Sequence, residues 1–547
     1  MSEQLLEMDE AGLDAAQEEL GLDELRPGQD EAIRALAEGH DVLAVMPTGF
    51  GKSAIYQLAG ALLDGPTVVV SPLLALQADQ TESIGELFGG ALALNSTLGV
   101  RAREDVFESL ASGELEFLLL APEQLLREDT LERVVAARPS LFVVDEAHCI
   151  SSWGHDVRPD YLRLGEVVTR LAGPRVLALT ATAAPPVRDE IVEQLRMSDP
   201  VVIVSGFERP NVVLEVRQHQ EPDQAADALV EWCTGRPGTG MVFVARRRDA
   251  EELAARLREA GRDAEAYHAG MKAAARHEVH RRFSDPDEDL VVVATTAFGM
   301  GIDAPHVRFV AHWGAPESID AYYQEFGRAG RDGEPADAVL FAARTGGAKR
   351  QFMAGSTRLD REDLEHAAAQ IHEAGSLRRT ALTGTRSRVA VTVDLLQRVG
   401  AVQPGRRGEL RWTGALSLDE AVLRAGRRHE TGAALSRTRA EMMRSYVETQ
   451  GCRWRFVLGQ LGEPTTQDCG HCDNCAGGAG SPASSGSTGS SEDEGPFPAG
   501  REVRHAEWGD GRVVGVDGDT LTVLFETEGY RNLSVDLVVE HDLLQLR

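Results

Sequence analysis

The chain has 547 residues, of which 42% are hydrophobic and 26% charged, and its formal net charge is −31. This length exceeds a single hydrophobic core and predicts about three to four domains, while the apolar content excludes wholesale disorder. No apolar run in the sequence reaches the roughly 18 residues of a membrane span. The acidic N-terminus lacks the basic stretch of a signal peptide, so we expect a cytoplasmic protein with no membrane partner. The six cysteines are too few for a disulfide scaffold.

Charge is distributed unevenly along the chain. Residues 1–25 form an acidic segment with nine acids and no base, whereas residues 376–460 hold sixteen arginines against seven acids. A basic island in an acidic protein can serve as a surface for a polyanion. The alternative is an arginine-rich helical surface that neighbouring acids balance, and charge alone does not choose between the two.

Short β-branched runs alternate with helical patterns from residue 41 to about 341. Strands of four to six apolar residues separated by helices are typical of parallel, doubly wound sheets. They are too many for one sheet, so we predict two α/β lobes, over 26–206 and 207–345, that meet at GlyPheGluArgPro (206–210). The predicted strands are Asp41–Met46, Thr67–Val70, Phe117–Leu120, Leu141–Val144, Val176–Leu179, Met241–Val244, Leu290–Ala294 and Phe309–Ala311.

Beyond residue 346 the pattern becomes helical. Helices are predicted over 361–373, 377–382 and 388–399, and a turn-rich hairpin over 401–413 follows them, an order that resembles a winged helix. The predicted divisions are a winged-helix-like basic module over 346–435, helices with a cysteine cluster over 436–476, a flexible Gly/Ser linker over 477–497 and a small β-barrel over 498–547.

A phosphate-binding loop is predicted between the first strand and the next helix. In ProThrGlyPheGlyLysSer (47–53), backbone N–H groups and the positive end of a helix would face a phosphate. Lys52, one of only three lysines, would reach the β- and γ-phosphates of ATP, and Ser53 would bind Mg²⁺. The strict P-loop pattern has Gly where Met46 stands, so this is a variant form. The candidate nucleotide-binding residues of the loop are Thr48, Gly49, Gly51, Lys52 and Ser53.

The second half of such a site is a strand that ends in a carboxylate. LeuPheValValAspGluAlaHis (141–148) supplies it. Asp145 would hold Mg²⁺, and Glu146 would orient and deprotonate the attacking water. Two acids after an apolar strand are often only the start of a loop, but together with Lys52 they predict a catalytic pair.

Several motifs give the chain a specific resemblance. TGFGKS, DEAH, Thr-Ala-Thr and TyrTyrGlnGluPheGlyArgAlaGlyArgAspGly (322–333) stand in the order found in superfamily 2 helicases. The segments AHCISSWGHDVRPDY (147–161) and AFGMGID (297–303) narrow the resemblance to the RecQ family of DNA helicases. It extends from about Leu20 to Cys475 and implies two RecA-like lobes that close on ATP.

The resemblance implies roles for motifs in the first lobe. Arg26 and Gln29 match the motif that reads adenine. SerProLeuLeuAlaLeu (71–76) and AlaProGluGlnLeu (121–125) match motifs that contact the nucleic acid strand, and the threonines of 180–182 match the motif that links nucleotide state to lobe position.

The second lobe is expected to supply arginines to the same site. Gln324, Arg328 and Arg331 match the family motif that reaches across the cleft. A guanidinium on the opposing lobe can neutralise charge on the transferring γ-phosphoryl group, so the site would be complete only when the lobes close. Spacing does not say which arginine is the finger. The alternative is a structural Arg–Asp cluster that uses Asp332.

Segment 147–161 resembles the aromatic-rich loop with which the family senses single-stranded DNA. Trp153 offers a stacking surface, and His155, Asp156 and Arg158 are candidates for the relay to the ATPase. The sequence departs from the family at Val157, where phenylalanine is usual, and this puts the strength of the coupling in doubt.

Four late cysteines predict a structural zinc site. Cys452, Cys469, Cys472 and Cys475 have the spacing C-x16-C-x2-C-x2-C, and four thiolates satisfy tetrahedral zinc with no open position. The surrounding sequence resembles the RecQ zinc-binding domain. His471 is a spare candidate ligand, and disulfides are the alternative.

The C-terminal segment resembles the small Tudor-like barrel that ends UvrD-type helicases. GlyArgGluValArgHisAlaGluTrpGlyAspGlyArgVal (500–513) carries the resemblance. It implies a protein-docking module, with RNA polymerase or a repair factor as partner. The acidic charge of this segment argues against DNA binding, and a barrel without a partner is the alternative.

These features together predict an ATP-driven, Mg²⁺-dependent DNA helicase of RecQ type that contains Zn²⁺. The resemblance implies 3′→5′ polarity, single-stranded and forked DNA as substrates, and a context of repair or recombination. The nearest rival is another nucleic-acid-stimulated ATPase, either an RNA helicase or a translocase that does not unwind. A non-catalytic DNA-binding scaffold is a third possibility, which the intact Lys52, Glu146, Arg328 and Arg331 disfavour.

Overall fold

The computed structural model describes most of the chain. The predicted acidic segment over 1–25 and the predicted linker over 477–497 lie almost wholly outside the described residues. The described residues are 25–72, 90–95, 98–151, 158, 160–171, 173–298, 304–344, 359, 361–405, 409–463, 465, 467–477, 496–498, 501–517, 520–525 and 528–547.

The first lobe is built on a seven-stranded parallel sheet. Its strands are β1 (Val42–Val45), β2 (Thr67–Val70), β3 (Ala91–Leu94), β4 (Phe117–Leu120), β5 (Leu141–Val144), β6 (Arg175–Thr180) and β7 (Val201–Val204), in the order β3-β4-β2-β5-β6-β1-β7. Successive residues of β1 belong to two separate apolar cores, so both faces of the sheet are covered, as a parallel sheet requires. The helices are α2 (Gln29–Glu38), α3 (Lys52–Leu62), α5 (Val100–Ser112), α6 (Pro122–Leu125), α7 (Glu128–Ala137), α8 (Leu164–Arg170) and α9 (Pro185–Gln194).

The second lobe repeats this architecture with six parallel strands. They are β8 (Val212–His219), β9 (Gly240–Val244), β10 (Ala264–Tyr267), β11 (Val291–Ala294), β12 (Phe309–Trp313) and β13 (Ala336–Ala343), in the order β10-β11-β9-β12-β13-β8. Apolar cores again cover both faces of the sheet. The helices are α10 (Pro222–Thr234), α11 (Arg247–Glu259), α12 (Ala273–Ser284) and α13 (Ile319–Phe326).

The strand order of the first lobe brings the predicted motifs together. β1 lies beside β6, with Val45 opposite Thr180, and β6 lies beside β5. Because carboxyl ends of parallel strands meet at one edge of a sheet, the phosphate loop, the acidic pair and the Thr-Ala-Thr motif share that edge.

After the second lobe comes a small module with its own core. It comprises α15 (Arg361–Ala374), β14 (Ser376–Arg378), the 3₁₀ turn η4 (Arg379–Ala381), α16 (Arg386–Arg398), β15 (Val402–Pro404) and β16 (Glu409–Trp412). The antiparallel order β14-β16-β15 gives this module the winged-helix arrangement. The helix predicted over 377–382 is wrong: pairing of Leu377 with Leu410 makes its start a strand, and the rest is η4.

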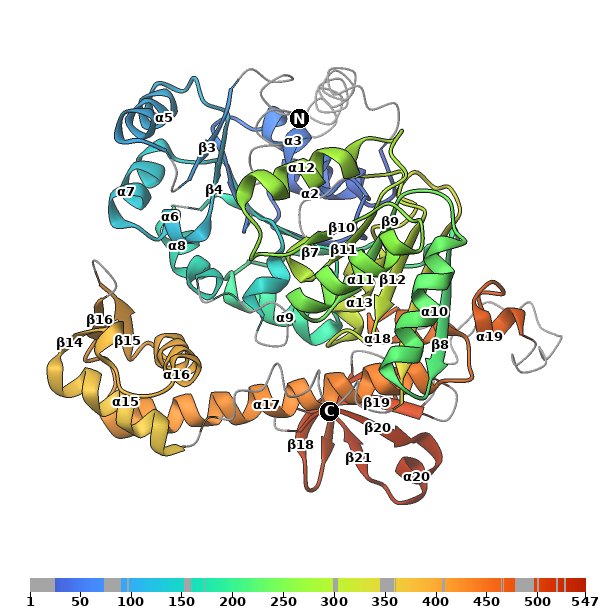
Figure 1. Cartoon of the computed structure of the whole chain (residues 1–547). Helices are drawn as coiled ribbons and strands as arrows, with labels where there is room; N and C mark the ends of the chain where they lie inside the picture. The colour runs from blue at the N-terminus through green and yellow to red at the C-terminus, as the bar shows by residue number, and fades with distance from the viewer. Residues whose placement is uncertain are drawn as a thin grey trace.

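A single long helix joins this module to the rest of the molecule. α17 (Leu418–Glu448) begins with a capping box formed by Ser417 and Glu420, and it passes without a break through residue 435, where the predicted boundary between modules lies. In Figure 1 it runs beneath the two lobes towards the short helices α18 (Arg453–Gln460) and α19 (Asp473–Ala476). None of the described helices has the length and apolarity needed to cross a bilayer.

The chain ends in a five-stranded antiparallel sheet, over the residues predicted to form a small barrel. Its strands are β17 (Glu502–His505), β18 (Gly509–Asp517), β19 (Thr520–Phe525), β20 (Gly529–Ser534) and β21 (Leu544–Leu546), and α20 (Val535–Glu540) precedes the last. This C-terminal domain has its own apolar core, and a second cluster docks it on α17, where Tyr530 packs with Leu435 and Met442. Figure 1 shows it below the C-terminal half of α17. The predicted fold class is confirmed for the two RecA-like lobes, the helical modules and a small antiparallel C-terminal sheet, and closure of that sheet into a barrel stays a prediction.

Candidate active site and metal centre

The phosphate loop lies between β1 and α3. Gly51 caps the N-terminus of α3 with φ 79°, and Gly49 has φ 78°, a left-handed conformation that disfavours residues with a Cβ atom. A Cβ atom at Gly49 would lie 3.0 Å from the Arg331 side chain, and one at Gly51 would lie 2.9 Å from Nε2 of Gln29. The loop is therefore a tight turn whose two glycines are closely approached by residues from elsewhere in the site.

Lys52 is the first residue of α3, and its ammonium group is turned back onto the loop. Nζ donates to the carbonyl oxygens of Met46 at 3.1 Å and Pro47 at 3.2 Å. Burial lowers the pKa of Lys52, while the charges of Glu146 and Asp145 oppose that shift. The ammonium thus bonds to two neutral carbonyls and lies near two carboxylates, a position from which it can bind phosphate oxygens.

Arg26 and Gln29 hold the loop from the N-terminal side. Nε2 of Gln29 donates to the carbonyl oxygens of Phe50 at 3.0 Å and Gly51 at 2.8 Å. Nη1 of Arg26 donates to the Gly49 carbonyl at 2.6 Å. The structure therefore places the two residues predicted to read adenine directly against the phosphate loop.

The acidic pair follows β5. Asp145 is buried, and its carboxylate accepts from the Glu146 amide at 2.9 Å and from Ser71 Oγ at 3.5 Å. Burial and the charge of Glu146 raise the pKa of Asp145 to about 7. Glu146 itself has φ 50°, which is uncommon for a residue other than glycine and directs its side chain into the site.

His148 joins the acidic pair to the Thr-Ala-Thr motif. Its Nδ1 lies 3.3 Å from Glu146 Oε2 and 3.0 Å from Thr180 Oγ1, and Thr180 Oγ1 donates to the Thr182 carbonyl at 3.0 Å. No role was predicted from the sequence for His148, the last residue of the DEAH motif. Its position two residues after Glu146 is the signal that could have pointed to it.

The second lobe brings its arginines to the phosphate loop. Thr48 Oγ1 donates to the carbonyl oxygen of Gly327 at 3.2 Å, a direct contact between the two lobes. Arg331 lies against Gly49 and lowers the pKa of Lys52 through its charge, although burial is the larger cause. Arg328 is buried just after the end of α13, which carries Gln324.

The alternative Arg–Asp cluster involves a different arginine. Asp332 accepts from Nη2 of Arg308 at 2.5 Å, and this contact lowers the pKa of Asp332 against the opposing effect of burial. Arg308 directly precedes β12 of the second lobe. The aspartate is thus held within the second lobe, away from Gly49.

Only the ends of the predicted DNA-sensing loop can be placed. Trp153, His155, Asp156 and Val157 lie outside the described residues. Ser151 Oγ donates to Glu190 Oε2 on α9 at 2.6 Å. At the other end, Nη1 of Arg158 donates to the Pro72 carbonyl at 3.2 Å, which ties this loop to the predicted strand-contacting motif over 71–76.

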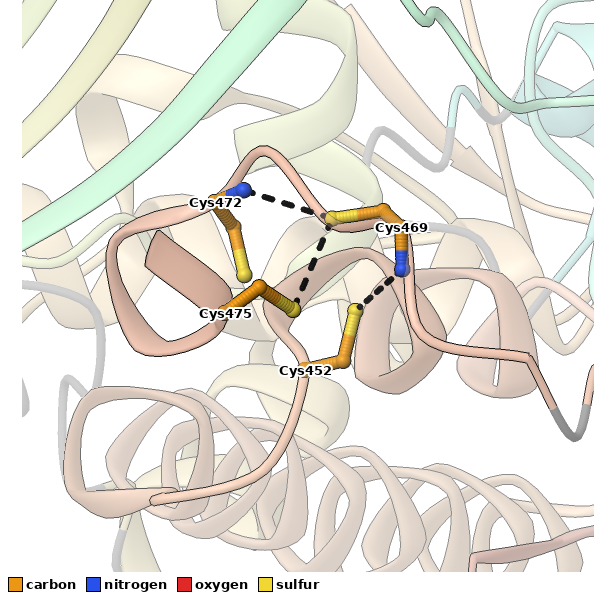
Figure 2. Close-up of side chains that lie close together, drawn as sticks. All are labelled: Cys452, Cys469, Cys472 and Cys475. Atoms are coloured by element: carbon orange, nitrogen blue, oxygen red, sulfur yellow. Dashed lines mark hydrogen bonds between the residues drawn. The ribbon is translucent and has the colours of Figure 1, made fainter. Parts of the chain in front are cut away.

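The four late cysteines converge on one point (Figure 2). Their Sγ atoms all lie within 4.8 Å of one another, and those of Cys469 and Cys475 are 4.0 Å apart. Tetrahedral zinc with Zn–S bonds of about 2.3 Å needs sulfur atoms about 3.8 Å apart, so the set fits zinc. All six cysteines are free, and backbone amides donate to three of the four sulfurs, as they do to thiolates. Nδ1 of His471 bonds instead to the Cys469 carbonyl.

The cysteine module is braced against the second lobe. Trp454 is buried, and its Nε1 donates to the Val212 carbonyl in β8 at 3.0 Å. Asp473 accepts from the Val216 amide at 2.9 Å and from Arg453 Nε at 2.5 Å. The metal-binding turn therefore rests on the edge strand β8 through both polar and apolar contacts.

Comparison with known proteins shows which families the chain resembles. Three family models match: DEAD/DEAH box helicase over residues 26–191, helicase conserved C-terminal domain over 223–333 and RecQ zinc-binding over 420–476. The chain is 39% identical over 327 residues to the probable ATP-dependent DNA helicase RecS of Bacillus subtilis, and 40% identical over 321 residues to the ATP-dependent DNA helicase RecQ of Haemophilus influenzae. The chain is therefore similar to RecQ-family helicases of superfamily 2 over its two lobes and its cysteine module. The four cysteines lie inside the match to the RecQ zinc-binding model.

Each match covers 59% of this chain, together with 65% of the Bacillus subtilis relative and 51% of the Haemophilus influenzae relative. The chain thus spans between half and two thirds of the length of these relatives. Among solved structures, the DUF1998 helicase MrfA bound to DNA superposes with a TM-score of 0.53 at 18% identity, covering 75% of this chain and 63% of that one. At this identity the likeness concerns the fold alone.

Proposed function

We propose that this chain is an ATP-dependent DNA helicase of RecQ type that moves 3′→5′ on single-stranded and forked DNA. One observation carries the proposal: the arginine-bearing loop of the second lobe touches the phosphate loop of the first, through Thr48 and Gly327 and through Arg331 and Gly49. A nucleotide bound at Lys52 would lie between the lobes. After cleavage, release of the inorganic phosphate would remove the charge that draws Arg331 inwards, and the lobes would separate.

Each residue of the site has a part in the proposed hydrolysis. Lys52 binds the β- and γ-phosphates, and Glu146 accepts a proton from the attacking water. Arg331, with Arg328 beside it, neutralises charge on the transferring phosphoryl group. Arg26 and Gln29 hold the loop and contact the adenine.

Mg²⁺ would be held by Ser53 and Asp145. Both offer oxygen ligands, which Mg²⁺ prefers, and when bound the ion would neutralise charge on the phosphates. Asp145 is buried directly beside Glu146, and its carboxylate accepts hydrogen bonds from the Glu146 amide and from Ser71 Oγ. A cation at this position would relieve the repulsion between the two acids, so the residues fit the ion.

DNA would act on this site through the loop that begins at Ser151. Trp153 would stack on a base, and His155, Asp156 and Arg158 would pass the signal to the ATPase. Contacts in support are those that anchor the two ends of the loop, at Glu190 and at Pro72. The neighbouring pair of His148 and Thr180 connects the catalytic acids with the motif that follows β6.

Strand displacement is the direct test of the proposal. We expect the purified chain, with ATP and Mg²⁺, to unwind a forked duplex with a 3′ overhang at least about tenfold faster than one with a 5′ overhang, and Lys52→Ala to abolish unwinding. Substrates with RNA as the loading strand separate the rival activities. Faster unwinding on RNA would indicate an RNA helicase, and ATP turnover without displacement would indicate a translocase.

The winged-helix-like module is proposed to bind duplex DNA through its sheet. Arg388 and Arg398 of α16 are already paired, with Asp363 at 2.6 Å and Asp394 at 2.7 Å. Arg378 and Arg411 are exposed on β14 and β16, which pair with each other. The described part of the sheet therefore presents two exposed arginines.

Reversing charge on this sheet is expected to weaken DNA binding. The double variant Arg378→Glu with Arg411→Glu should bind a forked duplex about tenfold more weakly in 0.1 M salt, with a salt dependence reduced by about two phosphate contacts. Fluorescence anisotropy over a salt series measures both quantities. Arg361→Glu on α15, where the arginine is paired with Glu365 at 2.7 Å, is the matched control. Equal loss in the control and the double variant would show that only net charge matters.

The C-terminal domain is proposed to dock a protein partner in a cytoplasmic repair or recombination setting, with RNA polymerase or a repair factor as candidates. The supporting feature is three exposed apolar residues on α20 and β21. Leu537 and Val539 of α20 are 50% and 57% exposed, and Leu546 of β21 is 53% exposed. Such residues, on an acidic domain, suit a protein surface better than a phosphate backbone.

A further inference from the structure

The segment that joins the two lobes donates several hydrogen bonds to the arginine-bearing loop. This joint runs from the end of β7 to the start of β8, and it contains Arg209 and Asn211. Nη2 of Arg209 donates to the carbonyl oxygens of Ala329 at 3.1 Å and Gly330 at 2.6 Å, and Nη1 lies 3.4 Å from that of Gly327. One guanidinium thus spans three carbonyls of a four-residue stretch.

Asn211 holds the same loop from its other end. Its Nδ2 donates to the carbonyl oxygens of Gly330 at 2.8 Å and Glu334 at 2.9 Å. Gly330 has φ 58°, and a Cβ atom there would lie 2.5 Å from the Asn211 amide nitrogen. The loop therefore bends tightly around the joint, with Arg328 inside the bend and Arg331 at its exit.

We infer that Arg209, assisted by Asn211, is a positioning residue that holds the arginine-bearing loop in the shape that delivers Arg331 to the phosphate site. This inference rests on the proposed ATP hydrolysis. The hydrogen bonds that Arg209 donates to the described residues of this loop all go to backbone carbonyls. It therefore fixes the path of the chain rather than the reacting groups.

The chemistry of the guanidinium explains why arginine stands at this position. A planar fork of donors can satisfy several carbonyls at once, whereas a lysine ammonium reaches as a single point charge. The Gly327 carbonyl also accepts from Thr48 of the first lobe at 3.2 Å. Arg209 of the joint and Thr48 of the phosphate loop thus both donate to the Gly327 carbonyl. When the Thr48 bond breaks, Arg209 would still hold the arginine-bearing loop in shape.

The joint is itself anchored on both sides. The Phe207 amide donates to Glu463 Oε2 of the zinc-binding module at 2.6 Å, and Tyr323 OH donates to the Phe207 carbonyl at 2.8 Å. Phe207 is fully buried. Arg209 therefore projects from a fixed backbone, which is what a positioning residue needs.

Steady-state ATP hydrolysis with oligo-dT tests the inference. A catalytic group displaced by about 1 Å can lose about 10²-fold in rate, so we expect Arg209→Ala to lower kcat by roughly that factor, and Arg209→Lys and Asn211→Ala by about tenfold. KM for ATP should change less than about threefold, because the residues around Lys52 are untouched. Arg308→Gln, which loses the Asp332 pair at 2.5 Å but none of the Gly327–Gly330 contacts, is the matched control and should keep near-normal kcat.

A double variant provides the sharpest readout. If Arg209 acts through the arginine loop, Arg209→Ala combined with Arg331→Ala should be no slower than Arg331→Ala alone, whereas independent effects would multiply. Multiplying effects, an unchanged kcat in Arg209→Ala, or losses that match those of Arg308→Gln would overturn the inference. A wild-type chain that turns over no ATP would overturn the proposed function with it, while an active wild type with an equally active Arg209→Ala overturns this inference alone.

Discussion

Glu146→Gln is expected to lower the kcat of DNA-stimulated ATP hydrolysis by about 10²- to 10⁴-fold while leaving ATP affinity within about threefold of wild type. Glutamine keeps the size of the side chain and can still bond to His148, 3.3 Å from Oε2, but it accepts no proton from water. The nucleotide contacts expected of Lys52 and Gln29 are unaffected. The loss should therefore appear in kcat and not in binding.

Two measurements check this prediction: phosphate release under saturating oligo-dT and equilibrium binding of a fluorescent ATP analogue. Lys52→Ala should instead lose affinity, since its ammonium binds the phosphates themselves. Glu114→Gln replaces an exposed glutamate far along the chain from the site and is the control for loss of one negative charge. A Glu146→Gln protein that retained more than about a tenth of the wild-type kcat would assign the proton transfer to another group.

The fold was most predictable where strands are buried along their whole length. β1, β2, β4 and β5 read as short apolar runs, and each was expected within one or two residues of its observed bounds. Five strands of the two lobes were not predicted: β3, β7, β8, β10 and β13. Half of β7 is exposed and three residues of β10 are only half-buried, so their sequences carry less apolar signal, and pairing with neighbours decides their structure.

Tertiary pairing also explains the helix wrongly expected over 377–382. Leu377 pairs with Leu410, more than thirty residues away along the chain, so the local sequence does not show that it belongs to a strand. Similarly, nothing local ends α17 near residue 435, where Leu435 is buried against the C-terminal sheet. Where the packing partner of a segment is distant in the sequence, local periodicity does not predict the structure of that segment.

The same distinction separates the predictable from the unpredictable parts of the site. Lys52, Asp145 and the four cysteines were identifiable because each stands in a local pattern with its own chemistry. The bond from Thr48 to Gly327 and the pairing of Asp332 with Arg308 join residues in different motifs, and only the fold brings them together. The hydrogen bonds of Arg209 to the arginine-bearing loop are also of this second kind, because the sequence predicted only a joint between the lobes at this segment.

Cys472→Ser is expected to remove zinc and to lower the free energy of unfolding by at least about 4 kcal/mol, because loss of a structural metal is among the most destabilising single changes. The Cys472 thiol is buried in the middle of the ligand set. Without the ion, the turn that carries Asp473 would lose its shape. Its contact with Val216 at 2.9 Å would then open, followed by the seat of Trp454 on β8.

This loss should reach the ATPase, because the zinc-binding module also holds the joint between the lobes. Glu463 bonds the Phe207 amide at 2.6 Å, and the Leu461 carbonyl accepts from Arg188 of the first lobe at 2.9 Å. The zinc content from elemental analysis, the melting temperature and kcat should therefore all fall in Cys472→Ser. Cys233→Ala, at a buried thiol in the second lobe remote from the cluster, should keep one zinc per chain and lose only about 1 kcal/mol. If Cys472→Ser matched this control in zinc content and melting temperature, the cluster would not be the element that anchors the module to β8.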